Sequence, residues 1–257
     1  LQGAVLFSHW RRIGADQKLL WLAVFGVLIL LILKQPNLST AALTGLLLWL
    51  MALAGGRPLL QLLGAAAGGA LLGSASIMIN SYQRDRVISF LDPWKDDRGS
   101  GYQLVQSLLA IGSGGVLGQG FGLSTQKLHY LPIQTTDFIF AVFAEEFGFV
   151  GCLIFLLFLI LFGFVGLRVA LSCSSPQHRL VAIGCTVLLV GQSILNIAVA
   201  TGSMPTTGLP LPMISYGGNS LLSSLLVAGL LVRCSLESAG METARPRRRR
   251  PAARPIG

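Results

Sequence analysis

The sequence predicts an all-α membrane protein, a polytopic bundle of transmembrane helices with one large loop on the outer side. Composition is the first reason. Hydrophobic residues make up 53% of the 257 residues and charged residues only 11%, whereas a soluble domain carries roughly 25% charged residues. The mean hydropathy of +0.71 agrees. Together these values disfavour a cytoplasmic enzyme, a disordered chain and a disulfide scaffold.

Long charge-free intervals are the second reason, because a helix needs roughly 20 apolar residues to cross a bilayer. The interval 19–33 is only fifteen residues long, which is short for a hydrocarbon core of ~30 Å. The interval 180–232 is too long for one helix, and the proline-rich stretch 204–212 divides it. The sequence therefore predicts six spans, at 19–33, 35–56, 58–83, 147–167, 180–201 and 216–233.

The short connections between these spans give the orientation. Seven of their basic residues fall on one side, which the positive-inside rule makes cytoplasmic, whereas Lys34 falls on the other. The seven residues are Arg11, Arg12, Lys18, Arg57, Arg168, Arg179 and Arg233. Both ends of the chain are then expected in the cytoplasm, with 1–240 as a single membrane domain. The segment 241–257, with six arginines and one acid, is expected to be a disordered basic tail that contacts anionic lipid rather than nucleic acid.

The outer segment 80–137 is where polar residues concentrate. Extended to Glu146, it holds seven of the ten acidic residues. A loop this long is usually functional or disordered, and its tyrosines, tryptophan and leucines argue against disorder. Its glycine-dense part, 111–122, has two readings that the sequence leaves open. It is either a close-packed turn with positive φ angles or a backbone nest for an anion.

Asp137 is the most informative residue, because it precedes Phe138 at the outer mouth of the fourth span. Partial desolvation beside aromatic rings would raise its pKa toward that of a useful general base, although an Asp here could also cap a helix. On a straight helix Glu145 would lie roughly 12 Å further along the axis. Asp137 and Glu145 are therefore not a direct proton-transfer pair, and the roles of Glu145 and Glu146 stay open between structural and functional.

Two arginines, Arg84 and Arg86, stand just outside the third span. They would either anchor the chain at the membrane interface or grip a phosphate, since a guanidinium group matches phosphate oxygens in a bidentate manner. The outer position favours the second role, because the positive-inside rule alone would not put arginines there.

A series of short motifs runs in order through the chain. They are Tyr-Gln-Arg-Asp-Arg-Val at 82–87, Phe-Leu-Asp-Pro-Trp at 90–94, Ser-Thr-Gln-Lys-Leu-His-Tyr-Leu-Pro at 124–132, Thr-Asp-Phe-Ile-Phe-Ala at 136–141, Pro-Thr-Thr-Gly-Leu-Pro-Leu-Pro at 205–212 and Ser-Tyr-Gly-Gly at 215–218. This set resembles the SEDS family (shape, elongation, division and sporulation), and its forms look most like the cell-division members. The family has ten transmembrane helices, so the resemblance implies that the six spans here are the last six and that the first four are absent.

The resemblance also implies a function, a peptidoglycan glycosyltransferase that polymerises lipid II on the outer face of the bacterial plasma membrane at the division site. Asp137 would be the catalytic general base that deprotonates the acceptor hydroxyl. Candidate substrate-binding residues on the matching motifs and beside them are Arg84, Arg86, Gln126, Lys127, Thr136, Glu145, Ser215 and Tyr216.

Partners implied by the resemblance are lipid II, undecaprenyl-linked glycan, membrane lipids, a class B penicillin-binding transpeptidase and other division proteins. The implied cofactor is at most a divalent cation, Mg²⁺ or Mn²⁺. Two other functions stay open. A lipid II flippase would depend on polar groups within the spans such as Gln192 and Asn196, for which interhelical hydrogen bonding is the favoured interpretation. A non-enzymatic division scaffold would not need Asp137.

Overall fold

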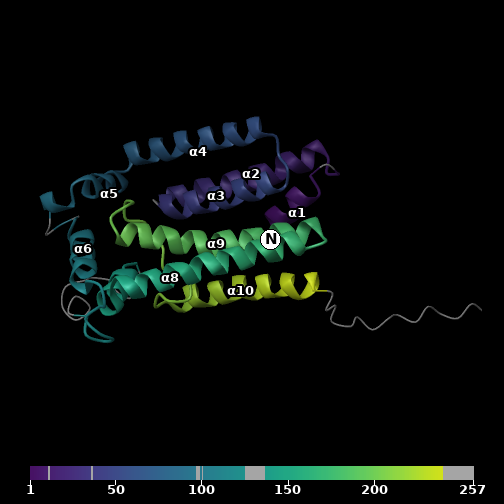
Figure 1. Ribbon diagram of the computed structural model, residues 1–257. Coiled ribbons are helices and arrows are strands. Elements are labelled where there is room, and N and C mark those ends of the chain that lie inside the picture. The colour runs from purple at the N-terminus through teal and green to yellow at the C-terminus, as the bar shows by residue number, and fades with distance from the viewer. Residues whose placement is uncertain (11, 36, 97–98, 100, 125–136, 240–257) are drawn as a thin grey trace, which may run out of the picture.

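The computed structural model describes residues 1–10, 12–35, 37–96, 99, 101–124 and 137–239, and every regular element in these ranges is a helix. Two groups of long helices lie side by side (Figure 1). One group contains α2 (Ala15–Lys34), α3 (Leu38–Ala54) and α4 (Leu59–Ile79), and the other contains α8 (Ile139–Ser172), α9 (Pro176–Ala200) and α10 (Gly218–Ser238). Helix α3 and the short α1 (Gln2–Ser8) both pack on α9 and join the two groups.

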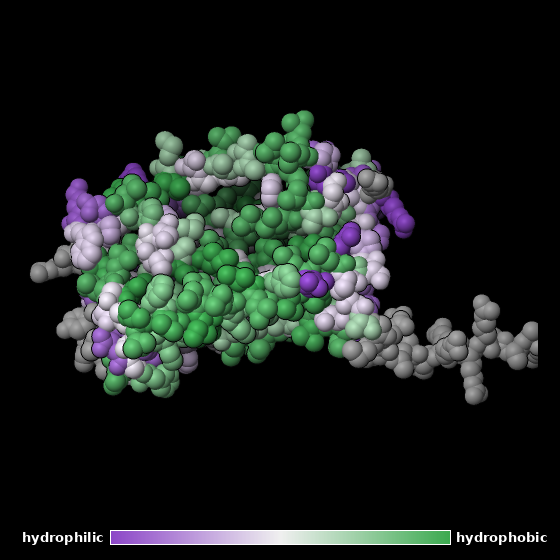
Figure 2. Space-filling view, viewed as in Figure 1, coloured by the Kyte–Doolittle hydropathy of each residue, from purple (hydrophilic) through white to green (hydrophobic). Residues whose placement is uncertain are grey.

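Within the described ranges, five helices are long and apolar enough to cross a membrane, namely α2, α4, α8, α9 and α10. Helix α3 is apolar but has 17 residues, at the lower end of the spanning range. Apolar side chains cover the middle of the molecule, and hydrophilic residues gather at its two ends (Figure 2). The chain is a multi-pass membrane protein, as its composition predicts.

Two predicted span boundaries are wrong. The first span is longer than fifteen residues, because α2 already begins at Ala15 and includes Asp16 and Lys18. Charged side chains near a helix end extend toward the headgroups and do not end the helix, so the 20 residues reach about 30 Å. The third span ends before residue 83. Helix α4 stops at Ile79, and Asn80 separates it from α5 (Ser81–Leu91).

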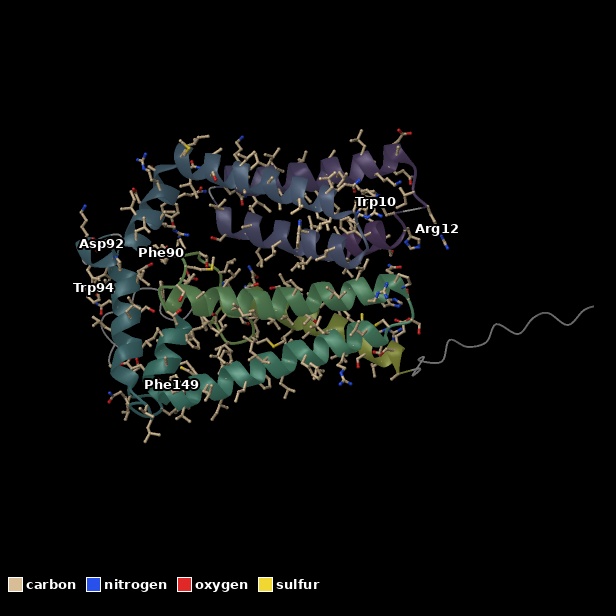
Figure 3. The ribbon with its side chains drawn as sticks, turned by 45° about the horizontal axis from the view of Figure 1, so that its top comes forward. Trp10, Arg12, Phe90, Asp92, Trp94 and Phe149 are labelled. Atoms are coloured by element: carbon tan, nitrogen blue, oxygen red, sulfur yellow. The ribbon has the colours of Figure 1, made fainter. Side chains whose placement is uncertain are left out.

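The bundle has two different ends (Figure 3). The basic end contains the start of α2, the α3–α4 and α8–α9 connections and the end of α10. There the guanidinium group of Arg57 lies 4.7 Å from the ring centroid of Trp10. The loop end contains the described residues 35, 37, 80–96, 99, 101–124, 137–138 and 201–217, and carries Asp92 and Trp94.

The loop end is folded around its own small core. Helix α5 is followed by the 3₁₀ helix η1 (Pro93–Asp96) and by α6 (Tyr102–Gly114). The hydroxyl of Ser107 on α6 donates to the carbonyl of Ala200 at the end of α9, at 2.7 Å. The buried side chains that join α6, α8 and α9 here are Ala110, Phe138, Phe140, Ala141, Val199 and Ala200.

Helix α8 is kinked at Gly148, where φ is 65° and ψ is −167°. The part before the kink, 139–147, packs at the loop end and buries Glu145 and Glu146. The part after it, 149–172, is long enough to cross the ~30 Å hydrocarbon core at about 1.5 Å per residue. The predicted fourth span therefore corresponds to the second part of one longer, bent helix.

At the kink, backbone groups of α8 lack their usual helical hydrogen-bond partners, and the glycine-dense stretch supplies new ones. The amides of Gln119 and Gly120 donate to the carbonyls of Glu145 and Glu146, at 2.9 and 3.1 Å. In return, Phe149 donates to the carbonyl of Gly115 at 3.0 Å. The close-packed reading of this stretch is thus confirmed, because these amides bind the protein's own helix.

Two glycines make this contact possible. Gly118 and Gly148 both have positive φ angles. A Cβ on Gly118 would overlap the Glu146 carbonyl, and one on Gly148 would overlap the backbone nitrogen of Gly118.

We therefore expect Gly118→Ala and Gly148→Ala each to lower the free energy of unfolding by about 3 kcal/mol, from left-handed strain and overlap together. The thermal unfolding midpoint of the detergent-solubilised full-length protein measures this effect. Gly69→Ala is the matched control, because that helical glycine has open space around its Cβ position. Equal midpoints for all three variants would contradict the close packing.

Candidate functional site

Asp137 lies directly before α8, at the loop end of the bundle. Its side chain is half-buried, and the following ring, Phe138, is 2% exposed. The N-cap residue of α8 is Phe138, whose side chain makes no capping hydrogen bond, so Asp137 does not occupy the N-cap position. Its Oδ2 atom lies beside Gly208, 3.9 Å from the position that a Cβ on that glycine would occupy.

Asn196 on α9 holds the backbone of Asp137 in place. Its side-chain amide donates to the carbonyl of Asp137 and to the carbonyl of Leu209, both at 2.9 Å. One turn earlier, Gln192 donates to the carbonyl of Pro210 at 2.8 Å. Both polar residues thus have structural partners, but in loops and not in a neighbouring helix as expected, since their side chains tie α9 to the segments at 137 and 209–210.

The connection 201–217 is therefore anchored along one side. Its later part is closed by Ser215, whose hydroxyl accepts a hydrogen bond from the amide of Leu211 at 2.7 Å. Ser215 is 5% exposed, whereas the neighbouring Tyr216 is 80% exposed. Of these two predicted substrate-binding residues, one stabilises the loop from inside and the other projects outward.

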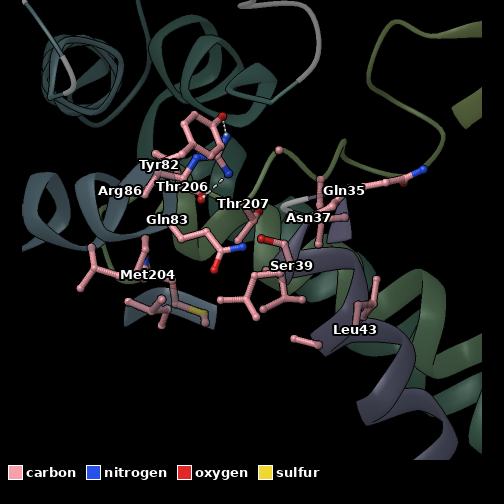
Figure 4. Close-up of a pocket in the computed structure, with 18 of the residues that line it drawn as sticks. Gln35, Asn37, Ser39, Leu43, Tyr82, Gln83, Arg86, Met204, Thr206 and Thr207 are labelled. Carbon is pink, nitrogen blue, oxygen red and sulfur yellow. Dashed lines mark hydrogen bonds between the residues drawn. The ribbon is translucent and has the colours of Figure 1, made fainter. Parts of the chain in front are cut away.

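A cavity of about 610 Å³ opens between the two helix groups at the loop end. Its walls come from the start of α3, the end of α4, one face of α5, Leu195 of α9 and the segment 204–209 (Figure 4). Gly208, beside the Asp137 carboxylate, belongs to this wall. Asp137 is not itself a lining residue, but its carboxylate lies next to one, Gly208, at the edge of the cavity.

The cavity is polar at one end and apolar at the other. The polar side chains in its wall are Gln35, Asn37, Ser39, Tyr82, Gln83, Arg86, Thr206 and Thr207. The apolar part is formed by residues of α3, α4 and α9, among them Leu43, Leu46, Ile77 and Leu195.

Arg86 is the one charged side chain among the described residues that line the cavity. It is half-buried, donates to the carbonyl of Thr206 at 3.0 Å and lies 4.6 Å from the ring centroid of Tyr82. A guanidinium group has five N–H donors, so donors remain for a ligand. The structure separates the two predicted arginines, since Arg84 is exposed and is not part of the lining.

Glu145 lies away from the cavity. It is 1% exposed and accepts a hydrogen bond from the hydroxyl of Ser124, which follows the glycine-dense stretch. The remaining predicted substrate-binding residues, Gln126, Lys127 and Thr136, lie outside the described residues.

Within the described ranges, no group of three or more His, Cys, Asp or Glu side chains could hold a metal ion. The described residues therefore do not form a metal site made of protein ligands alone. Mg²⁺, however, often binds through one or two carboxylates together with substrate phosphates, and Asp137 at the cavity edge suits this mode.

Sequence reasoning missed part of the cavity, including Ser39 and Gln83. Gln83 falls within the quoted 82–87 motif but was assigned to the end of a span. The sequence signal for the break before Gln83 is Asn80. This residue has a low helix propensity and lies between the end of α4 and the start of α5.

Replacing Asn196 tests its anchoring role. Asn196→Leu leaves two carbonyls without their donor, so we expect a loss of about 3 kcal/mol in the free energy of unfolding. The unfolding midpoint of the full-length protein in detergent is the measurement. Asn219→Leu, at an exposed position of α10, is the control and should leave the midpoint nearly unchanged. Equal midpoints for the two variants would contradict the role of Asn196.

Comparison with known proteins places the chain in a family. Residues 1–240 match the family model of the FtsW, RodA and SpoVE cell cycle proteins. The chain is 61% identical over 238 residues to a Synechocystis sp. protein named "Probable peptidoglycan glycosyltransferase FtsW", covering 93% of this chain and 61% of that protein. A Geobacter sulfurreducens protein of the same name is 39% identical over 220 residues, covering 86% and 59%. The chain thus spans about three fifths of the length of these curated relatives.

Two solved structures are similar. One is described as "Structural coordination of polymerization and crosslinking by a peptidoglycan synthase complex", with a TM-score of 0.62, 31% identity and coverage of 81% of this chain and 58% of that chain. The other is a Thermus thermophilus rod shape determining protein RodA with an Asp-to-Ala mutation, with a TM-score of 0.52, 29% identity and coverage of 82% and 55%. The chain therefore belongs to the FtsW, RodA and SpoVE family of cell cycle proteins, the family that its ordered motifs resemble.

Proposed function

We propose that this chain forms the catalytic part of a peptidoglycan glycosyltransferase that polymerises lipid II during cell division. The observation that carries the proposal is the position of the Asp137 carboxylate at the edge of a large cavity that also receives Arg86. The names of the curated relatives support the same activity.

The proposed reaction is a glycosyl transfer. Asp137, as general base, accepts the proton of the acceptor sugar hydroxyl. The hydroxyl oxygen forms a bond to the anomeric carbon of the donor, and the bond from that carbon to the pyrophosphate oxygen breaks. Undecaprenyl pyrophosphate leaves, and the guanidinium group of Arg86 stabilises the negative charge that develops on it.

The shape of the cavity supports a lipid-linked donor. A pyrophosphate would bind at the polar end beside Arg86, and a prenyl chain would follow the apolar wall of α3, α4 and α9 toward the lipid. We further propose that a divalent cation, Mg²⁺ or Mn²⁺, is held by Asp137 together with phosphate oxygens. Such a cation supplies charge neutralisation when bound.

We also propose a location and a partner. Basic side chains collect at the end opposite the cavity, which supports a cytoplasmic basic end with both chain ends there, in a bacterial plasma membrane. The cavity then faces outward, where peptidoglycan is assembled. The similar structure of a peptidoglycan synthase complex supports a penicillin-binding transpeptidase of class B as partner at the division site.

The decisive variant is Asp137→Asn. In the full-length protein it should lower the rate of glycan strand formation from lipid II by about 10³-fold, the size of a general-base contribution. Asp16→Asn, at an exposed position of the basic end, should polymerise like the wild type.

Undiminished polymerisation by Asp137→Asn would overturn the proposal. Lipid II movement across sealed vesicles by a wild type that makes no strands would favour the flippase alternative. Complementation of a deletion strain by Asp137→Asn would favour the scaffold.

The two arginines offer a matched pair. Arg86→Ala should weaken the binding of undecaprenyl pyrophosphate to the full-length protein about 30-fold, the loss of a charge-assisted hydrogen bond of about 2 kcal/mol. Arg84→Ala removes the same charge from an exposed position outside the cavity and should weaken it less than threefold. Equal losses in the two variants would contradict Arg86 as the phosphate ligand.

A further inference from the structure

Gln83 is a second polar group that α5 presents to the cavity, three residues before Arg86. It is 4% exposed. Its Oε1 atom accepts a hydrogen bond from the hydroxyl of Ser76 at 2.8 Å. Its Nε2 atom is buried and has no hydrogen-bond partner among the described residues.

The structure places Gln83 Oε1 against the hydroxyl of Ser76, which donates to it. Asn80 donates through its side-chain amide to Ser76 Oγ at 3.5 Å, a contact that leaves the Ser76 hydroxyl proton for Gln83 Oε1. The NH₂ group of Gln83 is left as the donor toward the cavity, whose wall includes Ser39 and Thr207 (Figure 4).

An unpaired buried amide costs about 1–3 kcal/mol, so an open donor in a cavity wall points to a ligand oxygen. A neutral donor at such depth suits a neutral oxygen better than a phosphate oxygen, because burying a charge costs far more. Arg86 already supplies the cationic group for a phosphate. The ligand of Gln83 is therefore a neutral acceptor close to that phosphate.

The spacing defines this acceptor further. Side chains three residues apart on a helix have Cβ atoms about 5–6 Å apart. In a 2-acetamido sugar 1-pyrophosphate the acetamido group sits on the carbon next to the one that carries the phosphate. Its carbonyl oxygen can therefore meet Gln83 while the pyrophosphate meets Arg86.

We propose that Gln83 is a specificity residue of the donor site, whose Nε2 donates a hydrogen bond to the acetamido carbonyl oxygen of a 2-acetamido sugar 1-pyrophosphate. This inference rests on the proposed function for the class of ligand. It adds a substrate feature, the acetamido group, and the residue that recognises it.

The test compares two probes on the full-length protein in detergent. Both are short-chain prenyl pyrophosphates, one carrying a 2-acetamido sugar and the other the 2-hydroxy sugar. Their dissociation constants give a preference ratio for each variant. Gln83→Leu should lower this ratio about tenfold by weakening only the acetamido probe, as expected for one lost hydrogen bond of about 1.4 kcal/mol.

Two further variants keep the test clear. Gln83→Glu keeps an acceptor for Ser76 but, ionised, has no donor, so it should lose the preference as well. Gln61→Leu makes the same exchange at an exposed position of α4 and should keep it. An unchanged ratio in both Gln83 variants, or equal weakening of both probes, would overturn the inference.

The two proposals can fail separately. If the wild type prefers the acetamido probe through Gln83 but makes no glycan strands from lipid II, the specificity role stands and the polymerase function fails. If it makes strands and the Gln83 variants keep the preference, the specificity role fails.

Discussion

The paired hydrogen bonds of Asn196 are the interaction on which the candidate site depends. Irregular backbone within a membrane bundle needs internal partners for its polar groups. One buried amide on α9 serves two such segments, at Asp137 and at Leu209. The backbone of Asp137 and the 204–209 wall of the cavity are therefore tied to the same point of the same helix. Gln192, which donates to the carbonyl of Pro210, adds a second tie from α9 to the segment that follows this wall.

The kink of α8 makes this arrangement possible. If α8 continued straight through residue 148, its first turns would extend the span and could not pack across the loop end. The bend breaks the helical hydrogen-bond ladder, and the amides and carbonyls of residues 115–120 restore partners on both sides of Gly148. The same contacts bury Glu145 and Glu146. The backbone carbonyls of these two residues therefore help to secure the segment that carries Asp137.

The sequence was enough to predict the helical membrane fold, because apolar intervals are long and charges are few. It also singled out Asp137 as the candidate general base, because an ionisable residue at the mouth of a span is a functional-site hypothesis by default. It could not predict that Arg86 lines the cavity while Arg84 is exposed. Their exposure depends on the rotation of α5, which is set by the break at Asn80. Nor could periodicity reveal that Ser124 binds Glu145, twenty-one residues later. Such contacts depend on how distant segments pack.

The low charge content of the chain explains why so few charged residues are enough to bind a ligand in the cavity. A single cation acts more strongly in a cavity with apolar walls than on a wet surface, because the local dielectric constant is lower. Arg86 is held there by Thr206 and Tyr82, with no acidic side chain among the described lining residues to neutralise it. A phosphate group is then the favoured charged ligand. Gln83 next to Arg86 adds selection without adding charge, so one face of α5 combines electrostatic attraction with recognition of a neutral group.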